Sequence, residues 1–119
     1  MKGPLQARSC RRHAYAVEKL ATAIRCLATH PGDVRERLIA AHLCFHTLQE
    51  RDFPPEHIEK WKSVMKELTK FGPLLDYKGE PWRGSVENTM KKVRNRTGVK
   101  IAEAIYDLYW SLSENTEYV

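Results

Sequence analysis

Two histidines spaced for one side of a helix are the residues in this chain best placed to bind a metal ion. His42 and His46 are four positions apart, and Glu50 follows one turn later, so a helix would point their side chains the same way. Such a pair is half of a zinc or iron site, and further ligands would have to come from His13 or Cys26. The chain has neither a His-Glu-x-x-His motif nor the Glu-x-x-His pairs of di-iron bundles. We therefore predict no metal site and no cofactor, and interpret both histidines as packing or hydrogen-bonding groups.

An arginine followed five positions later by a histidine occurs twice, as Arg25 with His30 and as Arg37 with His42. This spacing resembles the Arg-x4-6-His pair with which the small helical nucleases of the HEPN family cleave RNA at a dimer interface. The resemblance covers only these short spacings. The family tends to place a polar residue after the arginine, where this chain has a cysteine and a leucine. The resemblance implies a ribonuclease as a remote alternative, with these arginines and histidines as its catalytic residues.

The chain carries no other catalytic signature. Its six glycines are scattered singly, so there is no glycine-rich phosphate loop, and no serine lies in a Gly-x-Ser-x-Gly elbow. A Cys-x-x-Cys motif and a pair of carboxylates in an apolar setting are also missing from the sequence. We assign no catalytic residue and expect a protein that acts by binding.

A basic stretch between residues 78 and 100 is the first candidate binding surface. Its only acids are Glu80 and Glu87, and Tyr77 and Trp82 lie within or beside it. Cations with aromatic neighbours suit contacts with phosphates and stacking on bases, so this region predicts binding to nucleic acid or another polyanion. In this interpretation Tyr77 and Trp82 form a contact surface in a loop. The basic patch consists of Arg83, Lys91, Lys92, Arg94, Arg96 and Lys100.

The segment from Ala104 to Leu112 is the second candidate binding surface because it is apolar almost all round. A helix of that kind is either central or meets a partner. Tyr106, Tyr109 and Trp110 are aromatic residues of the type that anchors protein interfaces. We predict self-association or binding of a protein partner through these three side chains.

The charges of the last helix run against its macrodipole. Cations occupy its first half, up to Lys100, and acids begin at Glu103, whereas a helix favours anions at its N-terminus and cations at its C-terminus. Lys92, Arg96 and Lys100 also form an i, i+4 ridge of like charge. Antiparallel pairing of two such helices would set the basic half of one against the acidic half of the other, so we predict a homodimer.

Four helical segments must position these residues. Their apolar stripes at steps of three and four predict helices over about 9–29, 33–48, 54–71 and 85–113. Ser9, Asp33 and Ser85 are the expected N-caps, and Pro54-Pro55 opens the third helix. The last helix is expected to continue through Gly98, with a bend there at most. The sequence therefore predicts an all-α, four-helix bundle-like single domain.

Residues 72–84 form a long connection before the last helix. Two interpretations remain open for its apolar residues, which are Leu74, Leu75, Tyr77 and Trp82. They fold back to seal one end of the bundle, which we favour because an apolar loop must bury somewhere, or they form an exposed contact surface.

Composition places the chain among ordinary single-domain proteins. Its 119 residues are 42% hydrophobic and 29% charged, with a formal net charge of +5, which argues against disorder and is compatible with an acidic partner. Three cysteines without tight spacing predict reduced thiols. No apolar stretch is long enough to span a membrane, so we expect a cytoplasmic protein. Residues 1–8 are expected to form a short basic tail, and residues 114–119 a frayed end.

Overall fold

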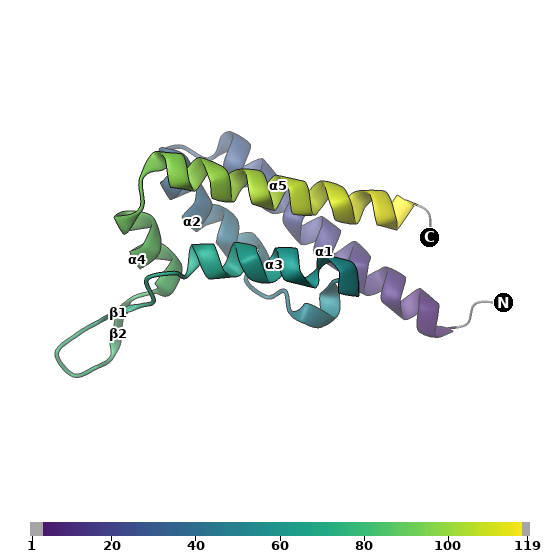
Figure 1. Cartoon of the computed structure of the whole chain (residues 1–119), viewed down its shortest axis with the longest axis horizontal. Helices are drawn as coiled ribbons and strands as arrows, with labels where there is room; N and C mark the ends of the chain where they lie inside the picture. Colours follow the sequence, from purple (N-terminus) through teal and green to yellow (C-terminus); the bar gives the residue numbers. More distant parts are fainter. Residues whose placement is uncertain (1–3, 118–119) are drawn as a thin grey trace.

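The computed structural model describes residues 4–117, with the side chains of residues 13–114. This part is predominantly helical, as predicted, but it contains five α-helices where four were predicted, and a two-stranded hairpin (Figure 1). The elements are α1 Pro4–Thr29, α2 Val34–Phe45, a 3-10 turn Glu50–Asp52, α3 Pro55–Leu68, β1 Leu74–Leu75, β2 Pro81–Arg83, α4 Ser85–Lys92 and α5 Asn95–Glu117.

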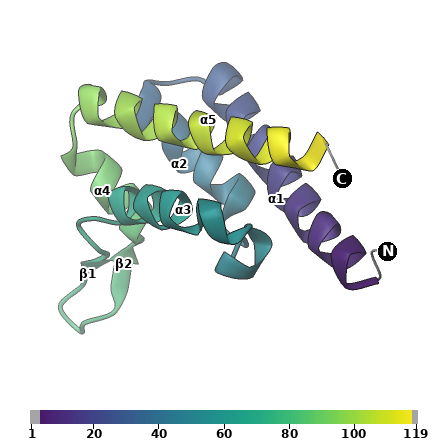
Figure 2. The same cartoon turned by 45° about the vertical axis from the view of Figure 1, so that its right-hand side comes forward.

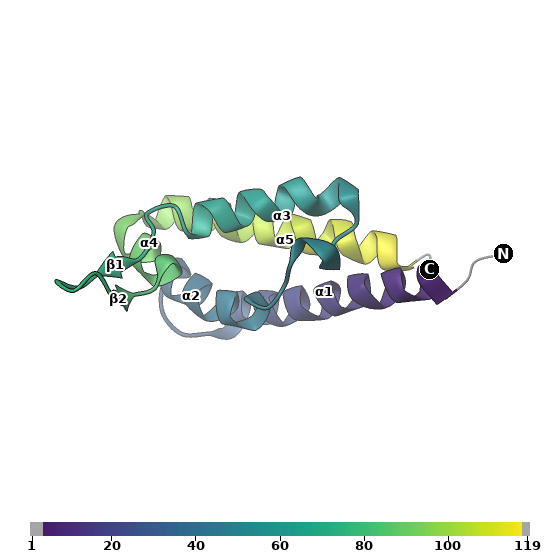
Figure 3. The same ribbon diagram turned by 90° about the horizontal axis from the view of Figure 1, so that it is seen from below.

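The long helices pack in two layers, with α3 and α5 in one and α1 and α2 in the other (Figure 3). Helix α5 contacts α1, α2 and α3, and α4 packs on α2 and α3. Helix α1 begins and α5 ends at one end of the molecule, and the hairpin projects from the opposite end (Figure 1). The candidate basic patch and the hairpin therefore share one end of the fold.

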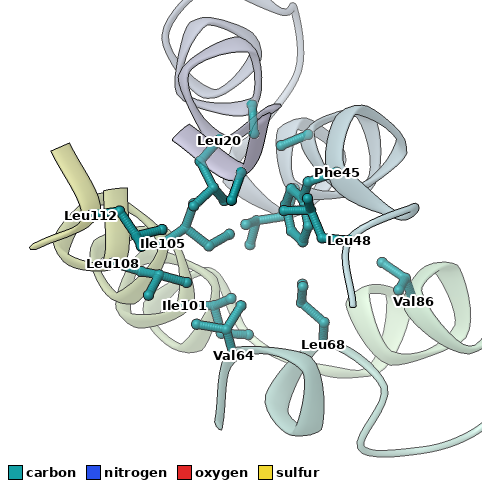
Figure 4. Packing of buried hydrophobic residues seen from close by; sticks show 14 of the residues in the cluster. Leu20, Phe45, Leu48, Val64, Leu68, Val86, Ile101, Ile105, Leu108 and Leu112 are labelled. Atoms are coloured by element: carbon teal, nitrogen blue, oxygen red, sulfur yellow. The ribbon is translucent and has the colours of Figure 1, made fainter. Parts of the chain in front are cut away.

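One hydrophobic core joins these helices (Figure 4). In α5 it takes residues at steps of four, three and four, the spacing of a single helical stripe. These residues are Ile101, Ile105, Leu108 and Leu112, each at most 3% exposed. The other helices contribute Leu20 from α1, Leu38 and Phe45 from α2, Leu68 from α3 and Met90 from α4, all fully or almost fully buried. The core stripe fixes which side of α5 remains for solvent or a partner.

Asp33 caps α2, as predicted. Its Oδ1 accepts hydrogen bonds from the backbone N–H of Arg35 at 3.0 Å and of Glu36 at 3.1 Å, which satisfies two of the free amides at the helix start. The guanidinium of Arg35 binds the same carboxylate at 2.9 Å. Hydrogen bonds from this guanidinium and from the Glu36 amide lower the pKa of Asp33.

Arg35 also explains why the predicted last helix is two helices. Helix α4 closes where the N–H of Val93 donates to Thr89 O, and α5 opens where the N–H of Gly98 donates to Arg94 O. Between the two helices the backbone oxygen of Val93 accepts a hydrogen bond from Arg35 Nη1 at 3.1 Å. In a continuous helix this oxygen would instead accept from the backbone N–H four residues later. The prediction of one helix over 85–113, bent at most at Gly98, was wrong: the chain breaks at Val93 and Arg94.

Gly98 lies inside α5 because α2 passes close to it. A Cβ built at this position would lie 2.9 Å from Val34 Cγ1, 3.4 Å from Arg35 Cγ and 3.5 Å from Leu38 Cδ1. Only glycine allows this approach without displacing a neighbour. Gly98 is therefore a packing residue where two helices touch.

Several helix ends differ from the predictions. Helix α1 begins at Pro4, so Ser9 lies inside it, and most of the expected tail at 1–8 is helical; residues 1–3 lie outside the described residues. Helix α5 continues to Glu117, into the segment expected to fray, and residues 118–119 are outside the described part. Gly84, not Ser85, is the N-cap of α4. Shifts of one or two residues are common at helix ends, and these changes leave the core stripe of α5 in place.

Candidate functional site

A short hairpin forms within residues 72–84, which were predicted to be a long ordered loop before the last helix. Strands β1 and β2 pair antiparallel, with Leu74 opposite Arg83. At the tip Asp76 Oδ1 accepts hydrogen bonds from the N–H of Lys78 at 2.8 Å and of Glu80 at 3.0 Å, and Gly79 has a positive φ of 82°. A short polar side chain and a glycine at these positions are what a tight turn requires. The tip therefore has a fixed shape.

The hairpin stands away from the bundle (Figures 1 and 2). Tyr77 is 92% exposed, Trp82 63% and Leu75 53%, while Leu74 at its base is half-buried. The favoured prediction that these residues fold back and seal the bundle is therefore wrong for the outer three. The connection has enough backbone hydrogen bonds of its own to hold its apolar side chains outward.

Each aromatic ring of the hairpin carries a cation. Arg83 Cζ lies 4.8 Å from the Trp82 ring centre and Lys78 Nζ lies 5.6 Å from that of Tyr77, within the range of cation–π attraction. Arg83 is further held by an ion pair between its Nε and Glu87 Oε1 at 3.2 Å. The outcome is a short arm that presents flat rings beside positive charge.

The predicted basic patch is spread over three elements. Arg83 ends β2, Lys91 and Lys92 lie in the last turn of α4, Arg94 lies at the break, and Arg96 and Lys100 follow in α5. Residues 70–96 contain seven cations against three acids, so this segment carries most of the formal net charge of +5. The predicted ridge from Lys92 through Arg96 to Lys100 is interrupted by the break, because α4 and α5 are separate helices.

The outer face of α5, opposite the core stripe, carries charges in a fixed order. Arg96, Lys100, Glu103 and Asp107 follow one another at steps of four, three and four, and all four are exposed. Like charges are therefore neighbours at i, i+4 twice, which destabilises an isolated helix. Among the described residues none of these four side chains forms an ion pair. We call these four residues the charged ridge.

Apolar side chains flank the charged ridge on the side facing α1. Val99, Tyr106 and Trp110 are 46%, 47% and 48% exposed, and the rings of the latter two meet edge to face at 6.1 Å. Tyr109, predicted with them as an interface residue, instead packs partly buried against the core. Beside this flank a groove of about 580 Å³ runs between α1, α2 and α5. Its lining includes Ile24, Leu27, Val34, Ala102 and Tyr106, with Arg37, Glu103 and Asp107 as polar members.

The histidines take up local contacts. The ring of His42 meets Phe45 edge to face at 5.5 Å and lies 6.3 Å from His46. Burial, and secondarily the neighbouring His46, lowers the pKa of His42. Among the described residues no three His, Cys, Asp or Glu side chains gather in a way that would hold a metal ion. This arrangement places His42 in packing contacts.

The two arginine–histidine pairs are not joined. His30 Nδ1 lies 2.9 Å from Pro31 O, and Arg37 Nη1 donates to Gly32 O at 2.6 Å. No hydrogen bond links either arginine to its histidine in the described part of the chain. The ribonuclease alternative concerns a site between two chains, and it stays a prediction from the sequence.

Sequence reasoning missed two features of the surface. Val99 was not predicted as exposed, although it lies next in phase to Tyr106 on α5. Phe71, the last residue of the helix predicted over 54–71, lies beyond the end of α3 at Leu68 and is 47% exposed, and Lys92 Nζ lies 5.6 Å from the centre of its ring. The exposure of these two side chains could have been predicted only if the ends of the helices and the faces of their residues had been assigned correctly.

No protein-family model, curated protein or solved structure matches this chain. Within the described residues, no helix combines the length and the apolar character needed to cross a bilayer.

Proposed function

We propose that this protein acts by binding, as a homodimer formed through the outer face of α5. The observation that carries the proposal is the charged ridge: two cations followed by two acids, exposed and without ion-pair partners in the described part of the chain. Such an order is unfavourable within one helix but self-complementary between two antiparallel copies.

A twofold axis between Lys100 and Glu103 defines the register. It sets Arg96 against the partner's Asp107 and Lys100 against the partner's Glu103, and symmetry repeats both pairs. The same register brings Tyr106 within a helical turn of the partner's Val99. The two apolar flanks then lie on the same side of the interface, where they continue into the groove beside α1.

The charged ridge and the aromatic flank are expected to contribute different amounts of free energy to the dimer. Exposed ion pairs contribute about 0.2–1 kcal/mol each, so the four symmetric pairs set register and orientation more than affinity. Burial of aromatic flanks contributes roughly 25 cal/mol per Å² and supplies most of the attraction. We therefore expect a dimer that weakens at high salt and that depends on Tyr106 and Trp110.

Charge reversal tests the pairing directly. An acidic variant (Arg96→Glu with Lys100→Glu) and a basic variant (Glu103→Lys with Asp107→Lys) should each be monomeric, because each would oppose like charges. Mixed in equal amounts they should form a heterodimer, since every pair is then restored. Sedimentation velocity at low and high salt measures all three states.

The matched control changes the same number of charges on another helix. Lys66→Glu with Lys70→Glu alters two exposed cations at the end of α3 and should leave the dimer intact. A wild-type protein that is monomeric at low salt, or two reversed variants that remain apart when mixed, would refute the proposal.

A second candidate function is binding of single-stranded nucleic acid by the hairpin end. It is supported by Tyr77 and Trp82, which are exposed rings with cations stacked on them. Stacking of a base on such a ring is worth about 1–3 kcal/mol, and the neighbouring cations of α4 suit the phosphates. The exposed hairpin supplies the rings on which bases would stack, and the neighbouring cations supply the contacts with phosphates.

Fluorescence anisotropy with a labelled oligonucleotide tests this second candidate. Trp82→Ala should weaken binding about tenfold, the equivalent of about 1.4 kcal/mol, without loss of helical circular dichroism. Tyr15→Ala, which removes an exposed ring of α1 that also carries a cation, is the control and should leave the affinity unchanged. Equal affinity of wild type and Trp82→Ala would exclude the hairpin as a stacking platform.

A further inference from the structure

Two thiols meet between α1 and α2, on elements that neither proposed binding function uses as its contact. Cys26 Sγ of α1 lies 3.3 Å from Cys44 Sγ of α2, and both side chains are partly buried against the core. Both cysteines are free. Eighteen positions separate them in the chain, so only the packing of the two helices brings them together.

We propose that Cys26 and Cys44 form a reversible intramolecular disulfide when the protein meets a hydroperoxide. A disulfide requires the two sulfurs to approach to about 2.05 Å, so each side chain has to shift by a fraction of an ångström to about one ångström. Helices α1 and α2 already pack along each other, so the two sulfurs lie side by side before oxidation. Hydrogen peroxide and organic hydroperoxides are the oxidants that fit partly buried thiols, because they are small.

The chemistry assigns different roles to the two sulfurs. Burial, and secondarily the hydrogen bond with Cys26, raises the pKa of Cys44 to about 11, so Cys44 stays a thiol at neutral pH. Because Cys44 keeps its proton, we assign the attack on the peroxide to the Cys26 sulfur.

The two steps balance as follows. The Cys26 sulfur attacks the outer oxygen of the hydroperoxide, the O–O bond breaks, and the transferred hydroxyl makes Cys26 a sulfenic acid. The alkoxide that leaves takes up the Cys26 proton and becomes an alcohol, or water when the oxidant is hydrogen peroxide. The Cys44 sulfur then attacks the sulfenic sulfur, the S–S bond forms, and the hydroxyl leaves as water with the Cys44 proton. Two thiols are oxidised by two electrons, and the peroxide is reduced by two. A small thiol reverses the bond by exchange.

The cross-link has a structural consequence. It would close a loop over residues 27–43 that contains the Pro31-Gly32 turn, and so restrict the unfolded chain. Since both α1 and α2 line the groove beside α5, oxidation would also fix the two helices that form one wall of it. The expected gain in thermal midpoint is on the order of 10 °C.

The full chain, purified under reductant and then treated with hydrogen peroxide at low protein concentration, tests the proposal. The intact mass should fall by two hydrogen atoms, and trypsin without reductant should release the peptide that begins at Cys26 linked to the peptide 38–51. Cys26→Ser and Cys44→Ser should each lose the linked peptide and the gain in thermal midpoint, while Cys10→Ser should keep both.

The readout on the wild-type chain does not depend on how the variants fold. If peroxide leaves Cys26 and Cys44 both open to alkylation, or joins either one to Cys10 or to a second chain instead, the proposal is overturned. A linked peptide without any change in thermal midpoint would retain the disulfide and overturn the expected stabilisation.

Discussion

Substitution of Gly98 by alanine sets helix propensity against packing, and the structure decides which effect is larger. Inside an α-helix alanine is favoured over glycine by about 1 kcal/mol. At position 98, however, the added Cβ would lie 2.9 Å from Val34 Cγ1, closer than carbon atoms normally approach. Val34 is 8% exposed and its branched side chain has few alternative rotamers. Overpacking of this kind costs about 1–3 kcal/mol, so Gly98→Ala should destabilise the protein by about 1 kcal/mol net.

Urea denaturation followed by helical circular dichroism measures this difference. It should be carried out at several protein concentrations, because self-association would add to the apparent stability. Ala104→Gly, at an exposed position of the same helix, is the control: it should cost about 1 kcal/mol from propensity alone.

A second substitution isolates the clash. In a Val34→Ala background the Cγ1 atom is gone, so Gly98→Ala should become neutral or stabilising by up to about 1 kcal/mol. The two changes should therefore be coupled by about 1–2 kcal/mol. If Gly98→Ala stabilises the wild-type chain by as much as Ala104→Gly destabilises it, α2 and α5 do not approach as closely as described and the reasoning fails.

Three further predictions follow from single sites. Leu108→Ala, in the core stripe, should cost about 2–5 kcal/mol of unfolding free energy, whereas Leu43→Ala, 66% exposed, should cost less than about 0.5 kcal/mol; equal losses in urea denaturation would contradict the assigned core. Because the pKa of His42 is lowered in the folded state, the unfolded chain binds more protons, so the free energy of unfolding should fall as pH drops below the ordinary histidine pKa of about 6.5. His42→Gln should reduce this pH dependence, and an unchanged pH profile of the variant would show that another group causes it. Asp33→Ala should lower the thermal midpoint at neutral pH. Because the pKa of Asp33 is lowered in the folded protein, its stabilising contribution is lost as pH falls through that lowered pKa, and the variant should not show this loss; scanning calorimetry from neutral to acidic pH measures both effects.

The core face of the last helix was predictable in part because it depends on local spacing. The steps of three and four that predicted the last helix select the residues now found in its core, such as Ile101 and Leu108. Asp33 as a cap and Pro54-Pro55 as a helix start are also local signals, and both are confirmed. Side-chain periodicity and capping need no knowledge of the rest of the fold.

The helix break was not predictable from nearby residues. Val93 and Arg94 carry no helix-breaking chemistry, and the apolar period passes through them without a phase shift. The group that takes the Val93 oxygen belongs to Arg35, 58 positions earlier. The meeting of Cys26 with Cys44 depends on tertiary packing in the same way, and so does the close approach that requires Gly98.

The hairpin did leave a signal. Asp76 and Gly79 are the residues that a tight turn needs at these positions, but the flanking strands have only two and three residues, too few for alternation to be visible. The assumption that apolar loop residues bury was the actual error, because backbone pairing and cation–aromatic contacts stabilise this loop without burying Tyr77 or Trp82.

The break also changes what the inverted charges of the last segment mean. Lys91 and Lys92 fall in the last turn of α4, where the helix dipole favours cations, so half of the apparent anomaly is ordinary helix electrostatics. The part that remains is the charged ridge of α5, where Arg96 and Lys100 precede Glu103 and Asp107 on an outward face. An explanation that involves a second chain is therefore needed only for these four residues. Reversal of all four in one chain would preserve self-complementarity, so this variant should dimerise like the wild type, while either half-reversal alone should not.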